Sequence, residues 1–402
     1  MKKSLIICGK LFDGIHDELF EHREILVEGG RIAAVGENLW RDENTEIIDL
    51  SHLTVTPGLI DAYMQAFDYD YRDFGRPASI DKETFATLNA AKKSLERGFT
   101  SVRMSGGPEG CNDVRRAIDQ GYFPGSRLQA AIATCTTGSS GDRSTIRYSL
   151  NPYMGEAMKK PGTGDGTDFF RYEVRRQIKY GYDFIKLVAS GGFFAQNGEP
   201  AEQQMDDDEL SVAISNARER GCNVTARAYE NSLIRKLVDM GAEVIEQAGF
   251  INEETAEYLV RKGSYVVPTF NLFEKEGKPD FMLEKLERYD EVLRHSRKII
   301  MKSGIKLCYG SAVLAGHNCY DSWREYRAWL EMGGEPYRML KGATSVNAEM
   351  MGWGDCLGSI EPGKLADIAA WHRDILNDPM ALSECDFVMK EGMVFPSVYS
   401  VD

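Results

Sequence analysis

A short sequence pattern recurs along the middle of the chain. It consists of a charged segment with helical spacing, then a glycine, then an apolar run rich in β-branched residues. The glycines of its six copies are Gly98, Gly181, Gly221, Gly241, Gly263 and Gly304. A glycine at this place is typical of a helix that ends in a left-handed residue, and the apolar run after it is typical of a buried parallel strand. The pattern therefore predicts helices that alternate with parallel strands.

Two further apolar runs, 53–60 and 127–132, raise the number of expected strands to eight. Eight alternating units favour a closed (β/α)₈ TIM barrel over an open sheet, and place active residues at the carboxyl ends of the strands. We therefore expect an α/β fold with a barrel domain over residues 53–354.

Both ends of the chain have a different pattern. Short strands at 24–27 and 31–35, joined by Glu28-Gly29-Gly30, indicate a β-hairpin. Similar short strands are expected near 367–371 and 387–392. The sequence therefore predicts one small β-sandwich-like domain, built from residues 1–52 and 355–402 together.

Composition narrows the class of protein. The chain has 402 residues, 43% of them hydrophobic and 27% charged, which is typical of a globular protein. A net charge of -14, spread along the chain, argues against nucleic acid and anionic membranes as partners. The apolar run near the start is too short for a signal peptide, and no run reaches the length of a transmembrane helix. We therefore expect a cytoplasmic protein.

The cysteines give no sign of a disulfide framework. There are eight, widely scattered and with no Cys-x-x-Cys pair. This usage argues against both disulfide bonds and a zinc knuckle, so free thiols are expected.

The segment Thr54-Val-Thr-Pro-Gly-Leu-Ile-Asp-Ala62 resembles a motif of the amidohydrolase superfamily, in its imidazolonepropionase-like and Xaa-Pro dipeptidase-like branch. Similar matches run through nearly the whole chain; they include Phe184-Ile-Lys-Leu-Val-Ala-Ser-Gly-Gly192, Tyr309-Gly-Ser311 and Leu357-Gly-Ser-Ile-Glu-Pro-Gly-Lys-Leu-Ala-Asp367. The resemblance implies the barrel fold and, by analogy, a homo-oligomer.

The same resemblance implies a metal site whose ligands are missing here. Family members usually hold one or two divalent metals with a His-x-His, a carbamylated lysine, two single histidines and an aspartate. The corresponding residues of this chain are Tyr63 and Gln65, Lys186, Arg227, Gln247 and Ala312, so only the lysine matches. The six histidines all lie elsewhere: His16, His22, His52, His295, His317 and His372. Divalent metals need imidazole, thiolate or carboxylate ligands, so we expect no metal and no cofactor.

These positions still form a plausible polar pocket. They carry two cations and no carboxylate, which predicts a small anionic ligand or substrate. Arg227 is expected to bind a substrate carboxylate in a bidentate pair, with Gln65 and Gln247 as hydrogen-bonding neighbours. Ala312 leaves space for ligand atoms where the family has an aspartate.

Lys186 is the main catalytic candidate. Without metals it is expected to be a free amine, whose pKa is lowered by a nearby arginine and by dry surroundings. It would then act as a general base or as an imine-forming nucleophile, with Tyr63 as proton donor. The alternative is that Lys186 is a catalytically silent relic.

Three further residues are candidates. Tyr229 follows Arg227 by two positions, so both point to the same side of a strand, where Tyr229 either binds substrate or packs in a loop. Ser140 lies in the loop after the third strand, where the family has a histidine, and is a substrate-binding candidate. His317 is an acid or base candidate in a loop past the eighth strand, or a surface residue. The glycine-rich segment 153–168 is expected to be a mobile lid.

Three functions remain open. The first is a metal-independent enzyme that acts on a small carboxylate- or amide-bearing substrate. The second is a catalytically inactive binding or scaffold protein. The third is a conventional metal-dependent hydrolase of C–N bonds, with ligands supplied by Asp61, Asp142 and Glu246. The first is favoured because nearly every replaced position keeps a hydrogen-bonding group.

Overall fold

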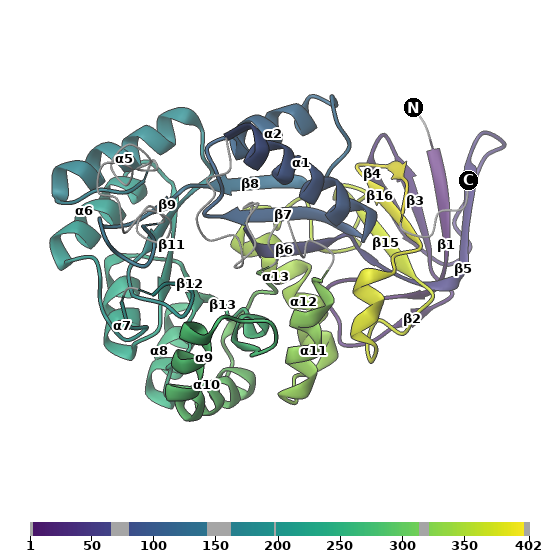
Figure 1. Ribbon diagram of the computed structural model, residues 1–402. Coiled ribbons are helices and arrows are strands. Elements are labelled where there is room, and N and C mark those ends of the chain that lie inside the picture. The colour runs from purple at the N-terminus through teal and green to yellow at the C-terminus, as the bar shows by residue number, and fades with distance from the viewer. Residues whose placement is uncertain (1–2, 66–79, 143–161, 197, 313–320, 398–402) are drawn as a thin grey trace.

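The computed structural model describes residues 3–65, 80–142, 162–196, 198–312 and 321–397 of the chain. It contains a barrel of parallel strands wrapped by helices, and beside it a β-sheet made from both chain ends (Figure 1). The barrel strands are β6 (Leu59–Met64), β7 (Phe99–Ser105), β8 (Arg127–Ala131), β10 (Phe184–Val188), β11 (Asn223–Ala228), β12 (Val244–Gln247), β13 (Tyr265–Val267) and β14 (Lys306–Leu307).

The barrel strands pair in parallel in two groups, β6 to β8 and β9 (Ala133–Thr134) to β14. Backbone hydrogen bonds join the groups at both seams. The amide of Ala62 donates to the carbonyl of Tyr309 at 2.9 Å, and the amide of Asp183 donates to the carbonyl of Ala130 at 3.0 Å. The predicted closed barrel is confirmed.

Helices cover the outside of the barrel (Figure 1). The α-helices are α1 (Ile80–Glu96), α2 (Cys111–Asp119), α5 (Thr167–Tyr180), α6 (Asp207–Arg218), α7 (Asn231–Met240), α8 (Glu253–Lys262), α9 (Asp280–Arg288), α10 (Asp290–Lys302), α11 (Trp323–Glu331), α12 (Pro336–Gly342) and α13 (Ser345–Met350). Two 3₁₀ helices are η2 (Phe270–Phe273) and η3 (Pro379–Ser383). None of the helices in the described ranges is long and apolar enough to cross a membrane.

The glycines that end these helices behave largely as expected. Five of the six have a positive φ, and Gly181, Gly241 and Gly263 are the left-handed caps of α5, α7 and α8. Gly304 differs, because α10 ends at Lys302 and its cap, Ser303, is extended with a φ of -77°. The recurring sequence pattern therefore predicts the strand after α10 correctly, but it does not predict how α10 ends.

The two chain ends share one sheet with the strand order β17-β16-β15-β5-β1-β3-β4, and β2 pairs with β1. In Figure 1 the N-terminal strands lie beside the C-terminal ones at one end of the molecule. The strands are β1 (Lys3–Leu11), β2 (Phe20–Glu21), β3 (Glu24–Glu28), β4 (Arg31–Gly36), β5 (Glu46–Pro57), β15 (Ile368–Trp371), β16 (Phe387–Lys390) and β17 (Met393–Phe395). The predicted hairpin is β3 and β4, which pair from Glu28 and Arg31 outward.

One expected barrel strand is divided between the two sheets. Residues 53–57 belong to β5, and 54–57 pair with β15, so the expectation that 53–60 is one barrel strand is wrong. The chain passes into the barrel at Gly58, where an added Cβ would lie 2.3 Å from the hydroxyl of Thr100. The apolar pattern runs on across this junction because both β5 and β6 are buried there.

Candidate functional site

A small cavity of about 40 Å³ lies at the carboxyl ends of the barrel strands. It is lined by Tyr63, Gln65, Ser105, Gly106, Ala133, Ser140, Gly141, Lys186, Val188 and Arg227. The described residues enclose room for only a few water molecules. The cavity brings together the candidates Tyr63, Gln65, Lys186, Arg227 and Ser140.

Lys186 is paired with a carboxylate that reaches it from another strand. Its side chain on β10 is almost fully buried, and its Nζ contacts Oε2 of Glu246 on β12, whose exposure is 0%. Ser105, the last residue of β7, connects the two. Its Oγ donates to Oε1 of Glu246 at 2.5 Å and accepts from Nζ of Lys186 at 3.4 Å. The three side chains form one hydrogen-bonded cluster.

In the sequence, Glu246 stands out only as a substitute metal ligand, and no pattern points to Ser105. A signal for Glu246 was present, because a carboxylate in the otherwise uncharged strand Val244–Gln247 needs a buried partner. No comparable signal marks Ser105, whose position depends on how β7 and β12 face each other across the barrel.

A second buried cation lies beside the cluster. Arg103 on β7 is 1% exposed, and its Nη1 lies 4.0 Å from Oε1 of Glu246. Its Nη2 donates to Oγ1 of Thr225 at 2.6 Å, and its guanidinium carbon lies 3.5 Å from the ring centre of Phe184. Burial lowers the pKa of Arg103 to about 9. Two cations thus share one carboxylate inside the barrel.

Burial also lowers the pKa of Lys186 well below its usual value, and the charges of Arg227 and Arg103 lower it further. Because Glu246 touches the amine, the charge of each group affects the other. The contact allows a proton to pass between the two groups, as an acid–base group requires.

Tyr63 and Gln65 form the wall beside Lys186. The Nε2 of Gln65 donates to the hydroxyl of Tyr63 at 2.8 Å, and Nζ of Lys186 lies 5.0 Å from the Tyr63 ring centre.

The amides of Tyr63 and Ser311 both donate to Oδ1 of Asp61 at 3.0 Å, and the Ser311 hydroxyl donates to Oδ2. Burial raises the pKa of Asp61 to about 6. Asp61 therefore holds the end of β6 in place.

Arg227, on β11, projects into the cavity with part of its guanidinium unused. Its Nη2 donates to the hydroxyl of Ser140 and to the carbonyl of Ser190, the latter at 2.8 Å. Within the described ranges, Nε has no hydrogen-bond partner. Gly192 lies against the guanidinium, since an added Cβ there would lie 3.3 Å from its central carbon. The guanidinium is thus held at Nη2, and its buried Nε is a donor without a partner among the described residues.

Gln247 and Tyr229 are paired with each other and do not line the cavity. The Tyr229 hydroxyl donates to Oε1 of Gln247, whose backbone has a φ of 73°. Tyr229 is fully buried and packs edge to face against Phe193. Burial raises the pKa of Tyr229. The roles of these two residues in substrate binding remain predictions.

The other candidates lie apart from the cavity or outside the description. Ala312 is 3% exposed, and its amide donates to the carbonyl of Tyr63 at 2.7 Å, next to the barrel seam. His317 lies outside the described residues, as does most of the expected lid, 153–161. The described part of that segment includes Gly162, whose carbonyl accepts from the amide of Cys135 at 2.9 Å.

The residues at the strand ends do not fit a divalent metal of the kind the family resemblance implies. At the expected ligand positions stand a phenol, two amides, a guanidinium and a methyl group, none of which is a usual ligand of these metals. The lysine is engaged by Glu246. In the parts of the chain that the structure covers, no group of three or more His, Cys, Asp or Glu side chains is placed to hold a metal.

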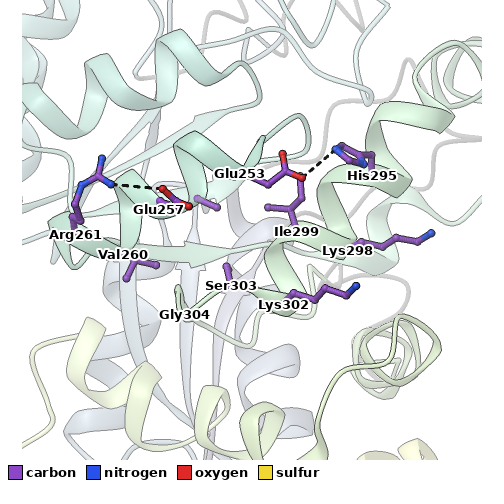
Figure 2. A pocket seen from close by; sticks show the side chains of 11 residues that line it. Glu253, Glu257, Val260, Arg261, His295, Lys298, Ile299, Lys302, Ser303 and Gly304 are labelled. Carbon is purple, nitrogen blue, oxygen red and sulfur yellow. Dashed lines mark ion pairs between the residues drawn. The ribbon is translucent and has the colours of Figure 1, made fainter.

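A larger groove of about 660 Å³ lies on the outside of the barrel, between α8 and α10. Figure 2 shows its charged side chains in two pairs, one between the two helices (His295 and Glu253, 3.7 Å) and one along α8 (Arg261 and Glu257, 4.0 Å). These side chains are exposed, and none comes from a barrel strand. We therefore place the chemistry in the smaller cavity.

A closed (β/α)₈ barrel with a polar cavity at its strand ends, joined to a β-domain built from both chain ends, defines a barrel protein of the amidohydrolase type. The model of the amidohydrolase family matches residues 54–395. The chain belongs to this family of hydrolases, and the predicted fold class and superfamily are confirmed.

Several known proteins are similar to the chain. Ochratoxinase of Aspergillus niger is 26% identical over 368 residues, which cover 84% of this chain and 75% of the relative. A solved Xaa-Pro dipeptidase with bound methionine in its active site has a TM-score of 0.88 and 25% identity, and the match covers 98% of this chain and 100% of that one. A solved amidohydrolase has a TM-score of 0.86 and 28% identity, with 99% and 100% covered.

Proposed function

We propose that the chain is a metal-independent enzyme that acts on a small carboxylate- or amide-bearing substrate. The observation that carries the proposal is the convergence of Lys186, Arg227 and Tyr63 on one cavity at the carboxyl ends of the strands. If the site had lost all function, we would not expect the replaced positions to keep hydrogen-bonding groups around a single cavity. This is the edge of a (β/α)₈ barrel where active sites lie.

The charged side chains around the cavity favour an anionic substrate. Lys186, Arg103 and Arg227 lie in or beside the cavity, and the carboxylate of Glu246 contacts Lys186 and lies 4.0 Å from Arg103. A substrate carboxylate on the free side of Arg227 would offset the remaining positive charge through charge-assisted hydrogen bonds. The bound methionine in the related Xaa-Pro dipeptidase is also a small molecule with a carboxylate.

The residues divide the work as follows. Arg227, supported by Ser140 and Gly192, binds and orients the carboxylate. The Lys186–Glu246 pair takes up and returns a proton. Tyr63, whose hydroxyl accepts from Gln65, lies over Lys186 and supplies a proton to the reacting group.

The proposal predicts that the purified protein does not depend on a divalent metal. After extensive dialysis, elemental analysis for zinc, manganese, iron, cobalt and nickel should find well below one metal per chain. EDTA should leave the melting temperature unchanged, because chelators unfold only proteins whose metal contributes to folding. A metal near one per chain would instead support a conventional metal-dependent hydrolase, with ligands to be sought among Asp61, Asp142 and Glu246.

Carboxylate binding is tested by ligand-induced thermal stabilisation. N-acetylmethionine should raise the melting temperature of the native protein more than the uncharged N-acetylmethioninamide does. Arg227→Ala should weaken binding of the acid by about 10- to 100-fold, since a hydrogen bond to a charged group contributes about 1.5–3 kcal/mol.

Arg235→Ala is the matched control, because Arg235 is a surface residue on α7 that pairs with the exposed Glu254. It removes the same charge far from the cavity and should leave binding unchanged. Equal stabilisation by the acid and the amide, or full binding by Arg227→Ala, would show that this arginine is not the carboxylate site.

A catalytically inactive binding protein is the second candidate. The contact between Lys186 and Glu246 favours it, because the amine already has a partner inside the protein. Under that alternative, Arg227-dependent binding persists and no substrate is turned over.

A further inference from the structure

Ser105 has a position that the function proposed so far does not use. It ends β7, lines the cavity and is 1% exposed. Its Oγ donates to Glu246 and accepts from Lys186, so the hydroxyl is held by both members of the buried pair. A hydroxyl oriented by a base, with the base oriented by a third group, is the arrangement of an activated nucleophile.

We propose that Ser105 is a catalytic nucleophile that forms an acyl-enzyme with a small amide or ester carrying a carboxylate. This inference rests on the proposed function, because Arg227 on the same cavity would hold the carboxylate of that substrate.

The backbone at Ser105 suits this role. The next residue, Gly106, has a φ of 86°, and an added Cβ would lie 3.2 Å from the Cβ of Ala133. Strand β7 therefore turns sharply directly after the serine, at a position that favours glycine. Gly106 also lines the cavity, so the turn leaves the serine at the wall of the site.

The hydrogen bonds define the proton path. Ser105 attacks the acyl carbon, and its proton passes to Oε1 of Glu246, to which it already donates at 2.5 Å. A bond forms between Oγ and carbon while the carbonyl double bond opens onto its oxygen. When that oxygen re-forms the double bond, the bond to the leaving nitrogen or oxygen breaks, and the leaving atom takes the proton from Glu246.

Water completes the cycle. It adds to the acyl-enzyme, gives its proton to Glu246, and the returning proton releases Ser105 as a hydroxyl. Lys186 contacts both Glu246 and Ser105 in the resting site, where its Nζ would stabilise the carboxylate that accepts each proton. No co-reactant besides water is needed.

The test uses p-nitrophenyl acetate, a small activated ester, on the full-length protein. We expect a burst of about one p-nitrophenol per chain, as for covalent catalysis through an acyl-enzyme. Trypsin cleavage after Arg103 and Arg115 gives a peptide in which Ser105 is the single serine. Mass spectrometry of the quenched burst should find one acetyl group on that serine.

Ser105→Ala should lose the burst and keep its melting temperature within a few degrees. The control is Ser139→Ala, a buried serine that donates to the carbonyl of Thr136 and does not line the cavity; it should keep the burst. Adduct mapping on the native protein does not depend on the folding of either variant.

Acetylation of Lys186 instead of Ser105, a burst that survives Ser105→Ala, or no burst at all would each overturn the inference. The binding experiment separates this failure from a failure of the proposed function. If Ser105 stays unmodified while N-acetylmethionine still stabilises the protein through Arg227, the nucleophile is wrong and the carboxylate site stands. If both results are negative, both proposals fail.

Discussion

Replacing Lys186 by methionine is expected to lower the free energy of unfolding by about 3–5 kcal/mol, the usual effect of removing one member of a buried ion pair. The side chain of Glu246 is 0% exposed and would be left buried without the ammonium that touches it. Arg103 cannot replace the lysine, because its nearest nitrogen lies 4.0 Å from the carboxylate and no hydrogen bond joins them. Turnover of any substrate should also be lost.

The double variant Lys186→Met/Glu246→Gln should recover most of that stability, because the uncompensated carboxylate is gone. Urea unfolding of the two single variants and the double variant gives the interaction energy. Lys236→Met is the control for charge loss, since Lys236 pairs with the exposed Asp207 and should change stability by less than about 1 kcal/mol. A double variant less stable than Lys186→Met would show that the two residues are not an energetic pair.

Part of the barrel could be predicted from the sequence. The alternation of helices and strands was predictable because a helix that ends at a glycine and the buried strand after it are local features of the sequence. These features recur at Gly98, Gly181 and Gly221. The division of the apolar run 53–60 between two sheets at Gly58 could not be predicted, because β5 and β6 are both buried at their junction and so form one apolar run. Which sheet receives each strand depends on distant partners, here β15 and β7.

The site was predictable to the same extent. Motif positions identified Lys186 and Arg227 as residues at strand ends, and the cavity includes both. The partner of each side chain could not be predicted. Ser105 and Glu246 are 141 residues apart, and their hydrogen bond depends on how two strands face each other across the barrel. Gln247 pairs with Tyr229 beside a backbone turn with a positive φ that no sequence pattern indicated.

The loop after β10 depends on a buried lysine outside the cavity. Lys285 on α9 is 5% exposed, and its Nζ donates to the carbonyls of Gly192, Ala195 and Gly198 at 3.1, 2.8 and 2.7 Å. Burial lowers its pKa. Gly192 lies against the guanidinium of Arg227. A single ammonium group thus ties α9 to the loop that supports the carboxylate-binding arginine.

Lys285→Met should therefore weaken both folding and binding. We expect a loss of about 3 kcal/mol in the free energy of unfolding, because three carbonyls lose a charged donor and burial offsets part of each bond. N-acetylmethionine should bind more weakly although no residue of the cavity has changed. Lys298→Met on α10 is the control, since Lys298 lines only the outer groove and should have neither effect. Weaker folding with unchanged binding would mean that the loop keeps its position without Lys285, and that Ser190 and Ser140 suffice to orient Arg227.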